Sequence, residues 1–403
     1  MRNEARGLNP RNILKLATFM LLLGMGNYVP SGKGLPENER MTDWNEISTG
    51  FERFMGCPSP ANAQVFLETL PKDRTIKELG KKADFLKLFA DWRLAAFRDE
   101  IISGKRPAIE AAFRLLNVLE RDRLRYVCIA LGHTIRLYPE AFLELVHEYR
   151  NRFYIRNAGC PTGFVMESYE RVGTAKLFEL KMRLNALERI HLGAVEREKA
   201  SCVSKLKEEI LKQAALSPEL GISNIPNRPL EGGASRLEEE MTVKASRAFI
   251  DYPSLENARR LRDLLPRTRQ KIAFSPIDLE YDYWILENEA FAGNIYAAEC
   301  VCRLLNASDG IAGIIYPTTL GTLIRVNPKV FLEVIKKYRE QPDILATVLY
   351  YNSGFSFKES TRNCILKERL RILMAVDDPE LLDVKNSCIR YIRKHLQTAP
   401  SEF

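Results

Sequence analysis

Histidine is scarce in this chain, with four residues among 403. The sequence also lacks the Gly-x-Ser-x-Gly elbow of serine hydrolases, the phosphate loop of P-loop NTPases and the His-Glu-x-x-His helix of zinc peptidases. No glycine-rich dinucleotide-binding turn follows a strand-like run. These absences leave carboxylates as the main groups for acid or base chemistry. We therefore expect no catalytic residue and no cofactor, and we favour a non-enzymatic protein.

The strict alternation of apolar and polar residues that is typical of exposed β-strands is missing too. Apolar residues recur instead at helical spacing, for example at Phe142, Leu145, Val146 and Tyr149. Pro139 stands just before this stripe, where proline suits the first turn of a helix. The pattern predicts an all-α protein.

Much of the chain occurs twice. Residues 110–117 (EAAFRLLN) return as residues 299–306 (ECVCRLLN), at an offset of 189 positions that continues downstream. Residues 54–71 return as residues 249–266, at an offset of 195. Internal repeats of this kind define the architecture of a chain. We predict two tandem homologous multi-helix units, arranged either as an α-solenoid-like array or as a pair of bundles.

The proposed boundaries follow from the repeat and from composition. The region between the copies carries three prolines and three glycines, which favours a linker. The predicted segments are 1–26 (signal peptide or membrane anchor), 27–43 (flexible segment), 44–213 (the first unit), 214–241 (linker) and 242–403 (the second unit).

Short helices joined by tight proline turns, as near Pro71, Pro139, Pro266 and Pro328, resemble those of HEAT and armadillo-like repeat proteins. The resemblance covers most of both units and rests on this general pattern. It implies a curved α-solenoid that binds other macromolecules on its concave face. A pair of compact helical bundles is the alternative.

The N-terminal residues have the pattern of a targeting segment. Arg2, Arg6, Arg11 and Lys15 lead into an uncharged apolar run at residues 16–25. This run is shorter than the ~20 residues of a membrane-spanning helix. We predict an exported chain that is periplasmic, secreted or anchored by residues 1–26, and that meets a membrane only through them. The alternative is a cytoplasmic chain with a buried first helix.

Eight cysteines are present, an even number that favours disulfides in an exported protein. Cys300 and Cys302 replace apolar residues of the first unit, so we expect them to pack, and their spacing does not fit a zinc site. Cys57 and Cys160 each precede a proline and lack a cysteine counterpart in the second unit. We predict a Cys57–Cys160 disulfide and no metal site.

Charged residues shared by both units are candidates for structural roles. They are Glu110, Arg114, Arg136, Glu299, Arg303 and Arg325. The glutamate and arginine at 110 and 114, and those at 299 and 303, have the i,i+4 spacing of helical ion pairs. Arg136 and Arg325 are expected to brace neighbouring helices. The alternative is an enzyme in which shared carboxylates and arginines meet in a groove between the units.

Two features occur in the second unit only, and we expect a partner to bind there. The first is a basic run made of Arg259, Arg260, Arg262, Arg267, Arg269 and Lys271. The second is an aromatic cluster made of Tyr281, Tyr283 and Trp284. These features predict a scaffold that binds a protein or peptide. The basic run, in a chain of net charge +8, leaves nucleic-acid or polyanion binding as the alternative.

Overall fold

The structure is a computed structural model of the full chain, and it describes ten stretches of residues. These are 37–70, 91–116, 119, 121–149, 173–216, 234–266, 283–307, 312–341, 344–349 and 359–398. Residues 1–26, the predicted signal peptide or anchor, lie outside the described residues.

The described residues form sixteen α-helices and three short 3-10 helices, with no strand, so the all-α prediction is confirmed for this part of the chain. The elements before residue 217 are α2 (Glu37–Gly56), α3 (Pro60–Thr69), α6 (Asp91–Ile102), α7 (Arg106–Leu115), α8 (Arg121–Leu137), α9 (Pro139–Tyr149), α12 (Gly173–Glu188), η1 (Gly193–Val195) and α13 (Glu196–Leu216).

The elements after residue 233 follow in nearly the same order as those before residue 217. They are α14 (Ala234–Asp251), α15 (Leu255–Leu264), α16 (Tyr283–Phe291), α17 (Ile295–Ala307), α18 (Ala312–Val326), α19 (Pro328–Tyr338), η2 (Leu345–Leu349), α20 (Glu359–Ala375), η3 (Pro379–Leu381) and α21 (Leu382–Thr398). Helices α9 and α19, for example, both have 11 residues and begin at prolines 189 positions apart.

Helices extend into two of the predicted connecting segments. Helix α2 begins at Glu37, inside the segment predicted to be flexible. Helix α13 continues to Leu216 and α14 begins at Ala234, so both ends of the predicted linker are helical. The reason is local: the prolines and glycines stand between residues 217 and 233, whereas residues 234–241 (ASRLEEEM) are mostly good helix formers.

The same capping chemistry begins α3 and α15. The Ser59 and Ser254 hydroxyls accept hydrogen bonds from the backbone N–H groups of Asn62 and Asn257, at 3.2 Å in both cases. Each asparagine side chain also donates to a carbonyl at the end of the preceding segment. These bonds satisfy helix-terminal backbone groups and set the angle between each helix and the one before it.

Helices α6 and α16 are each followed by a glycine that allows an abrupt turn. Gly104 and Gly293 have φ angles of 79° and 96°, a conformation that other residues adopt at an energetic cost. A Cβ atom on Gly104 would lie 2.6 Å from the Tyr138 ring. The turns place Lys105 and Asn294 at the starts of α7 and α17, beside the ends of the preceding helices.

The core of the N-terminal helices contains an aromatic cluster. Phe51 and Phe54 of α2, Phe66 of α3 and Phe97 of α6 are all fully buried. Their ring centroids lie 5.2–6.2 Å apart, mostly edge to face. This cluster joins three helices and fixes the position of α6, whose other side carries the charged residues described below.

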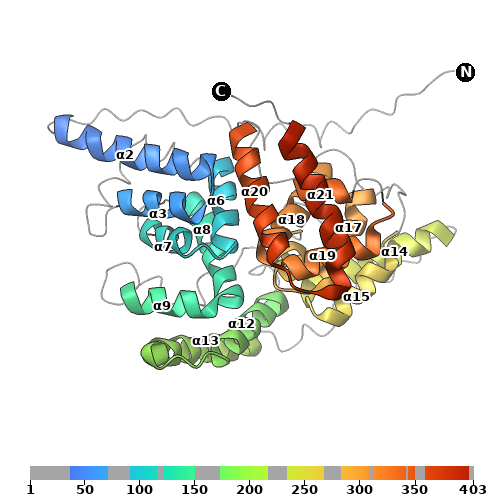
Figure 1. The fold of residues 1–403 in the computed structure, drawn as a ribbon. Coiled ribbons are helices and arrows are strands. Elements are labelled where there is room, and N and C mark those ends of the chain that lie inside the picture. Colours follow the sequence, from blue (N-terminus) through green and yellow to red (C-terminus); the bar gives the residue numbers. More distant parts are fainter. Residues whose placement is uncertain are drawn as a thin grey trace, which may run out of the picture.

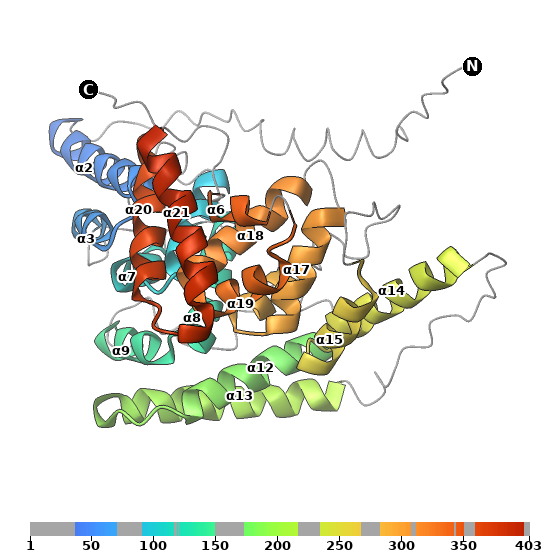
Figure 2. The same cartoon turned by 45° about the vertical axis from the view of Figure 1, so that its right-hand side comes forward.

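Helices that are distant in sequence are in contact. Figure 1 shows α2, α3, α7 and α9 on the left and α14, α15 and α17 on the right, with α20 between the two groups. Helix α20 contacts α2, and α12 contacts α14. Figure 2 shows α12 and α13 together below the other helices, reaching toward α14 and α15. Helices α6, α8, α16 and α18 bring charged residues together in the middle of the molecule.

Candidate functional site

The residues of the basic run that was predicted to bind a partner differ in their exposure to solvent. Arg259 and Arg260 are exposed on α15, whereas Arg262 is only 9% exposed and binds Glu299 of α17 at 2.8 Å. Arg262 therefore does not belong to a binding surface, because the buried face of α15 includes its position. Asp263, which follows it, lies within ion-pair distance of Arg259 and Arg262. Outside the described residues lie Arg267, Arg269 and Lys271.

The aromatic cluster is not an exposed anchor either. Tyr283 is 2% exposed and its hydroxyl bonds the Thr319 hydroxyl, while its ring packs edge to face on Tyr316. Trp284 is half-buried under the guanidinium of Arg98, which lies 4.2 Å from its ring centroid. Tyr281 lies outside the described residues. The described aromatic side chains therefore pack inside the protein, which corrects their prediction as contact residues.

Two of the shared charged residues, Arg136 and Arg325, lie instead in one buried cluster with neighbours that the sequence did not single out. We call this set the polar seam, and each member is 12% exposed or less. It consists of Arg98, Asp99, Glu100, Lys105, Arg136, Glu179, Glu287, Glu289, Arg325 and Glu368.

The centre of the polar seam joins corresponding residues of the two predicted units. Arg98 of α6 forms a buried ion pair with Glu287 of α16, and these two positions are themselves 189 apart. Thr319 of α18 donates to the same glutamate at 2.8 Å. A residue therefore meets its own counterpart, and the two side chains carry opposite charges.

Two further ion pairs flank this centre and exchange partners between the units. Arg136 of α8 binds Glu289 of α16 at 2.7 Å. Arg325 of α18 binds Glu100 of α6, with one of its two contacts at 2.8 Å. Arg136 corresponds to Arg325 and Glu100 to Glu289, so the second pair is the first with the units interchanged. Both arginines brace neighbouring helices through carboxylates, in agreement with their predicted role.

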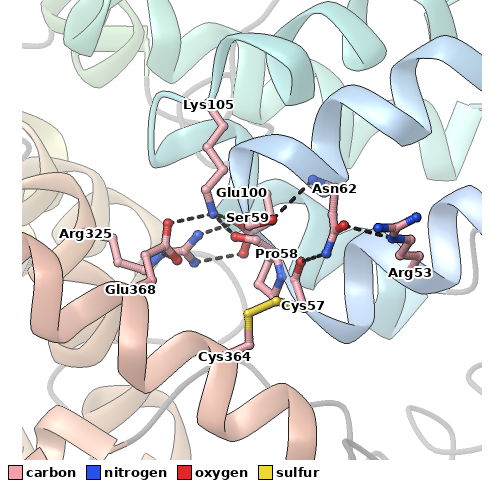
Figure 3. The surroundings of a disulfide bond; sticks show 10 residues. All are labelled: Arg53, Cys57, Pro58, Ser59, Asn62, Glu100, Lys105, Arg325, Cys364 and Glu368. Atoms are coloured by element: carbon pink, nitrogen blue, oxygen red, sulfur yellow. Dashed lines mark hydrogen bonds and ion pairs between the residues drawn. A yellow bond between two sulfur atoms is a disulfide. The ribbon is translucent and has the colours of Figure 1, made fainter.

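The polar seam continues outward through a second carboxylate on each side. Arg136 binds Glu179 of α12 at 2.7 Å, and Arg183 binds the same carboxylate at 2.8 Å. On the other side, the Arg325 Nε lies 3.1 Å from Glu368 of α20. Lys105 lies 2.8 Å from Glu368 and also binds Glu100 (Figure 3). Buried charges are costly unless they are paired, and each of these carboxylates has a cation.

Matched carboxylates in the polar seam differ in proton affinity. Burial raises the pKa of Glu289, and the opposing effect of Arg136 does not cancel it. Burial also favours protonation of Glu100, but Arg325 and Lys105 together hold its pKa below the ordinary range. The position that matches Lys105 is Asn294, which is uncharged. The extra lysine therefore makes one side of the polar seam more strongly ionic than the other.

Asp99 is a buried carboxyl of the described part whose pKa lies near neutral pH. Burial raises its pKa from 3.8 to about 7, with Glu287 and Glu100 acting in the same direction and Arg98 and Arg325 opposing. Its carboxylate lies 3.3 Å from the Thr322 hydroxyl. The folded protein therefore keeps this proton at pH values where the unfolded chain has released it.

We predict that Asp99→Asn stabilises the protein progressively as the pH rises. Because the folded-state pKa is raised, Asp99 lowers the free energy of unfolding between about pH 4 and pH 7, and the loss persists above that range. Asparagine has no proton to release, so its advantage should grow over this window to on the order of 2–4 kcal/mol. Urea denaturation at several pH values measures it. A pH-independent difference from wild type would contradict the prediction, and the exposed Asp263→Asn serves as control.

The other shared residues form a bracket around a helix end in each predicted unit. Arg114 of α7 donates to the Leu67 and Leu70 carbonyls at the end of α3, and to the Tyr149 hydroxyl and Glu110. The Glu110–Arg114 ion pair is thus confirmed at 2.6 Å. This arginine satisfies carbonyls that a helix C-terminus leaves without partners.

Arg303 forms the same bracket in the second unit, donating to the Arg262 and Leu265 carbonyls and to the Tyr338 hydroxyl. The expected ion pair between Arg303 and Glu299, however, is replaced by other contacts of Glu299. Glu299 is 2.8 Å from Arg262 and 2.7 Å from Lys337, rather than paired with Arg303. The first unit has Leu67 and Glu148 at the positions of these two cations, so Glu110 turns to Arg114 instead.

The predicted Cys57–Cys160 disulfide is wrong. Cys57 is bonded to Cys364 of α20, and the two Cα atoms lie 5.3 Å apart (Figure 3). Cys160 lies outside the described residues. The sequence contained a usable signal, because Cys364 also lacks a cysteine counterpart: Ala175 stands 189 positions before it. The contact between α2 and α20 brings the two sulfurs together.

Among the described residues, no group of three or more His, Cys, Asp or Glu side chains could hold a metal ion. The helices in the described part include none with both the length and the apolar character needed to cross a membrane. Comparison with protein-family models, curated proteins and solved structures finds no match to this chain. The polar seam is therefore interpreted from its own geometry, which is a set of buried ion pairs with the protonatable Asp99 beside them.

Proposed function

We propose that this protein is a non-enzymatic helical scaffold, exported from the cytoplasm, that binds a protein or peptide partner. The observation that carries the proposal is how the shared charged residues are used. They pair with one another and with helix-terminal carbonyls, so their chemistry is directed at holding helices together. An enzyme needs acidic or basic groups that can reach a substrate, and side chains buried in ion pairs are poorly placed to do so.

We infer that the scaffold consists of two homologous bundles facing each other about an approximate two-fold axis. In an α-solenoid each repeat contacts only its neighbours in sequence. Here α6 reaches α16 and α18, and α20 reaches α2. The exchange of partners, Arg136 with Glu289 and Arg325 with Glu100, is the contact pattern of an isologous interface. These contacts support the paired-bundle alternative over the solenoid.

The outer surface of α14 and α15 is the docking surface that we propose. Of seven large apolar side chains that are exposed in the described part of the chain, three lie on these two helices. They are Met241, Val243 and Leu255, between 45% and 58% exposed. The exposed Arg259 and Arg260 lie on the same stretch of α15. Apolar side chains beside arginines are typical of protein-binding surfaces.

The polyanion alternative has less support from the described surface. Arg262 is buried, and the exposed Arg259 and Arg260 are accompanied on α15 by the exposed acids Glu256 and Asp263. Balanced charge of this kind attracts a nucleic-acid backbone weakly. Export is supported by the basic, then apolar, N-terminal segment and by the disulfide, which forms and persists in oxidising compartments.

Site-specific photo-crosslinking in the source cells tests the docking surface. A photoreactive residue at Leu255, which is 58% exposed, is expected to give one discrete covalent adduct. The same residue at Met374 of α20, which is 54% exposed, should give none. Leu255→Glu, combined with a photoreactive residue at Val243, should abolish the adduct. Equal adducts at positions 255 and 374, or none at either, would contradict the proposed surface.

A further inference from the structure

The Cys57–Cys364 disulfide joins parts of the chain that are far apart in sequence. It connects the end of α2 to α20 across 307 positions, and thereby links the two predicted units covalently. Figure 3 shows the bond beside the side chains of the polar seam. The cross-link therefore acts directly on the contact between the two units.

One residue separates the disulfide from the polar seam. The Pro58 carbonyl, next to Cys57, accepts a hydrogen bond from the Lys105 ammonium group. Lys105 binds Glu100 and Glu368, the two carboxylates that also bind Arg325 (Figure 3). A shift of the Cys57–Pro58 backbone relative to Lys105 would therefore remove one hydrogen-bond acceptor of this lysine.

The opposite side of the polar seam has the same local structure without the covalent bond. Tyr252 occupies the position of Cys57, and Asn257 donates to its carbonyl at 2.8 Å, as Asn62 does to that of Cys57. The Tyr252 ring packs edge to face on Phe178 of α12, with centroids 5.0 Å apart. The two sides of the polar seam can therefore be compared directly, because a disulfide joins the helices on one side and an aromatic pair joins them on the other.

The two cysteines of the disulfide are more exposed to solvent, and so to a reductant, than most of the other described cysteines. Cys57 and Cys364 are half-buried, whereas four of the five other cysteines in the described part are buried. Burial raises the pKa of Cys128 and of Cys388 to about 12, which keeps these thiols protonated and unreactive. Redox chemistry at moderate strength should therefore affect the cross-link first.

We propose that the Cys57–Cys364 disulfide is a redox-operated latch on one side of the polar seam. A dithiol reductant supplies two electrons and two protons, the S–S bond becomes two thiols, and the dithiol leaves as its own disulfide. The contact between α2 and α20 then loosens, and the ion pairs around Lys105 become hydrated. The aromatic side, with α12 and α14, stays closed. The latch does not depend on the proposed docking surface.

Hydrogen exchange on the folded full-length protein, with and without dithiothreitol, tests this latch. Amides in α20 and the last turns of α2 are expected to exchange at least about tenfold faster after reduction. Amides in α12 and α14 should keep their rates. The melting temperature should fall by roughly 5–10 °C on reduction and recover on reoxidation.

Variants separate the latch from general loosening. Cys57→Ser without reductant should reproduce the exchange pattern of the reduced protein and should not respond further to dithiothreitol. Tyr252→Ala should give the mirror-image result, with faster exchange in α12 and α14. Unchanged exchange in α20 after complete reduction, verified by mass spectrometry, would overturn the proposal. Equal acceleration in all four helices would overturn it as well.

Discussion

Arg98→Glu is expected to destabilise the protein by about 5 kcal/mol, because it places two carboxylates against each other in a buried site. Arg98 is 2% exposed and forms its ion pair with Glu287, which is 7% exposed. The guanidinium also lies over Trp284, a contact that glutamate cannot make. Chemical denaturation followed by circular dichroism at 222 nm measures the loss of unfolding free energy.

The charge-swapped double variant is the decisive control. Because Arg98 and Glu287 occupy corresponding positions, Arg98→Glu combined with Glu287→Arg retains one charge of each sign across the same contact. We expect the pair to recover about 2–3 kcal/mol relative to the sum of the single variants. The exposed pair Arg106–Glu144 gives the reference, and Arg106→Glu should cost at most about 1 kcal/mol. Additive single effects would contradict the pairing of the two helices in the seam.

Arg114→Met is expected to cost about 3–5 kcal/mol, since it removes the buried cation that serves four groups at once. Methionine fills much of the same space but leaves the Leu67 and Leu70 carbonyls, 2.8 and 2.7 Å from the lost nitrogen, without this donor. It also deprives Glu110 of its paired cation. Urea denaturation of the variant measures the effect.

The corresponding Arg303→Met is the matched comparison, and we expect it to cost roughly 1 kcal/mol less. It removes the same donor from two helix-terminal carbonyls. Glu299, however, retains Arg262 and Lys337 as partners, so no buried carboxylate loses its cation. If Arg303→Met proved the more destabilising of the two, the difference in carboxylate pairing would not control the cost.

Much of the local structure could be predicted from the sequence. The helical spacing that follows Pro139 marks where α9 begins, and the structure starts this helix at Pro139. Comparison of the two copies also identified Arg114 and Arg303 as structural residues, and both are buried in helix-terminal brackets. The start of a helix depends on residues within one helical turn, so a local pattern is sufficient to find it, whereas Arg114 and Arg303 were found by comparing the repeated segments.

The candidate binding residues were harder to predict, because charge in a sequence does not reveal which way a side chain points. Arg262 belongs to a conspicuous basic run, yet the packing of α15 on α17 buries it against Glu299. Tyr283 lies inward for the same reason, since α16 packs against α18. Each of these helices has several faces that could be buried, and the neighbouring helix decides which one is.

The sequence alone determined that this protein is helical and which charged residues its two copies share. Only the tertiary structure decided what those residues bind: Arg98 meets Glu287, Arg325 meets Glu100, and Cys57 meets Cys364. The physical reason is the range of the interactions. Helix periodicity and capping act over a few residues, whereas ion pairing and disulfide formation require surfaces that folding brings together from distant parts of the chain.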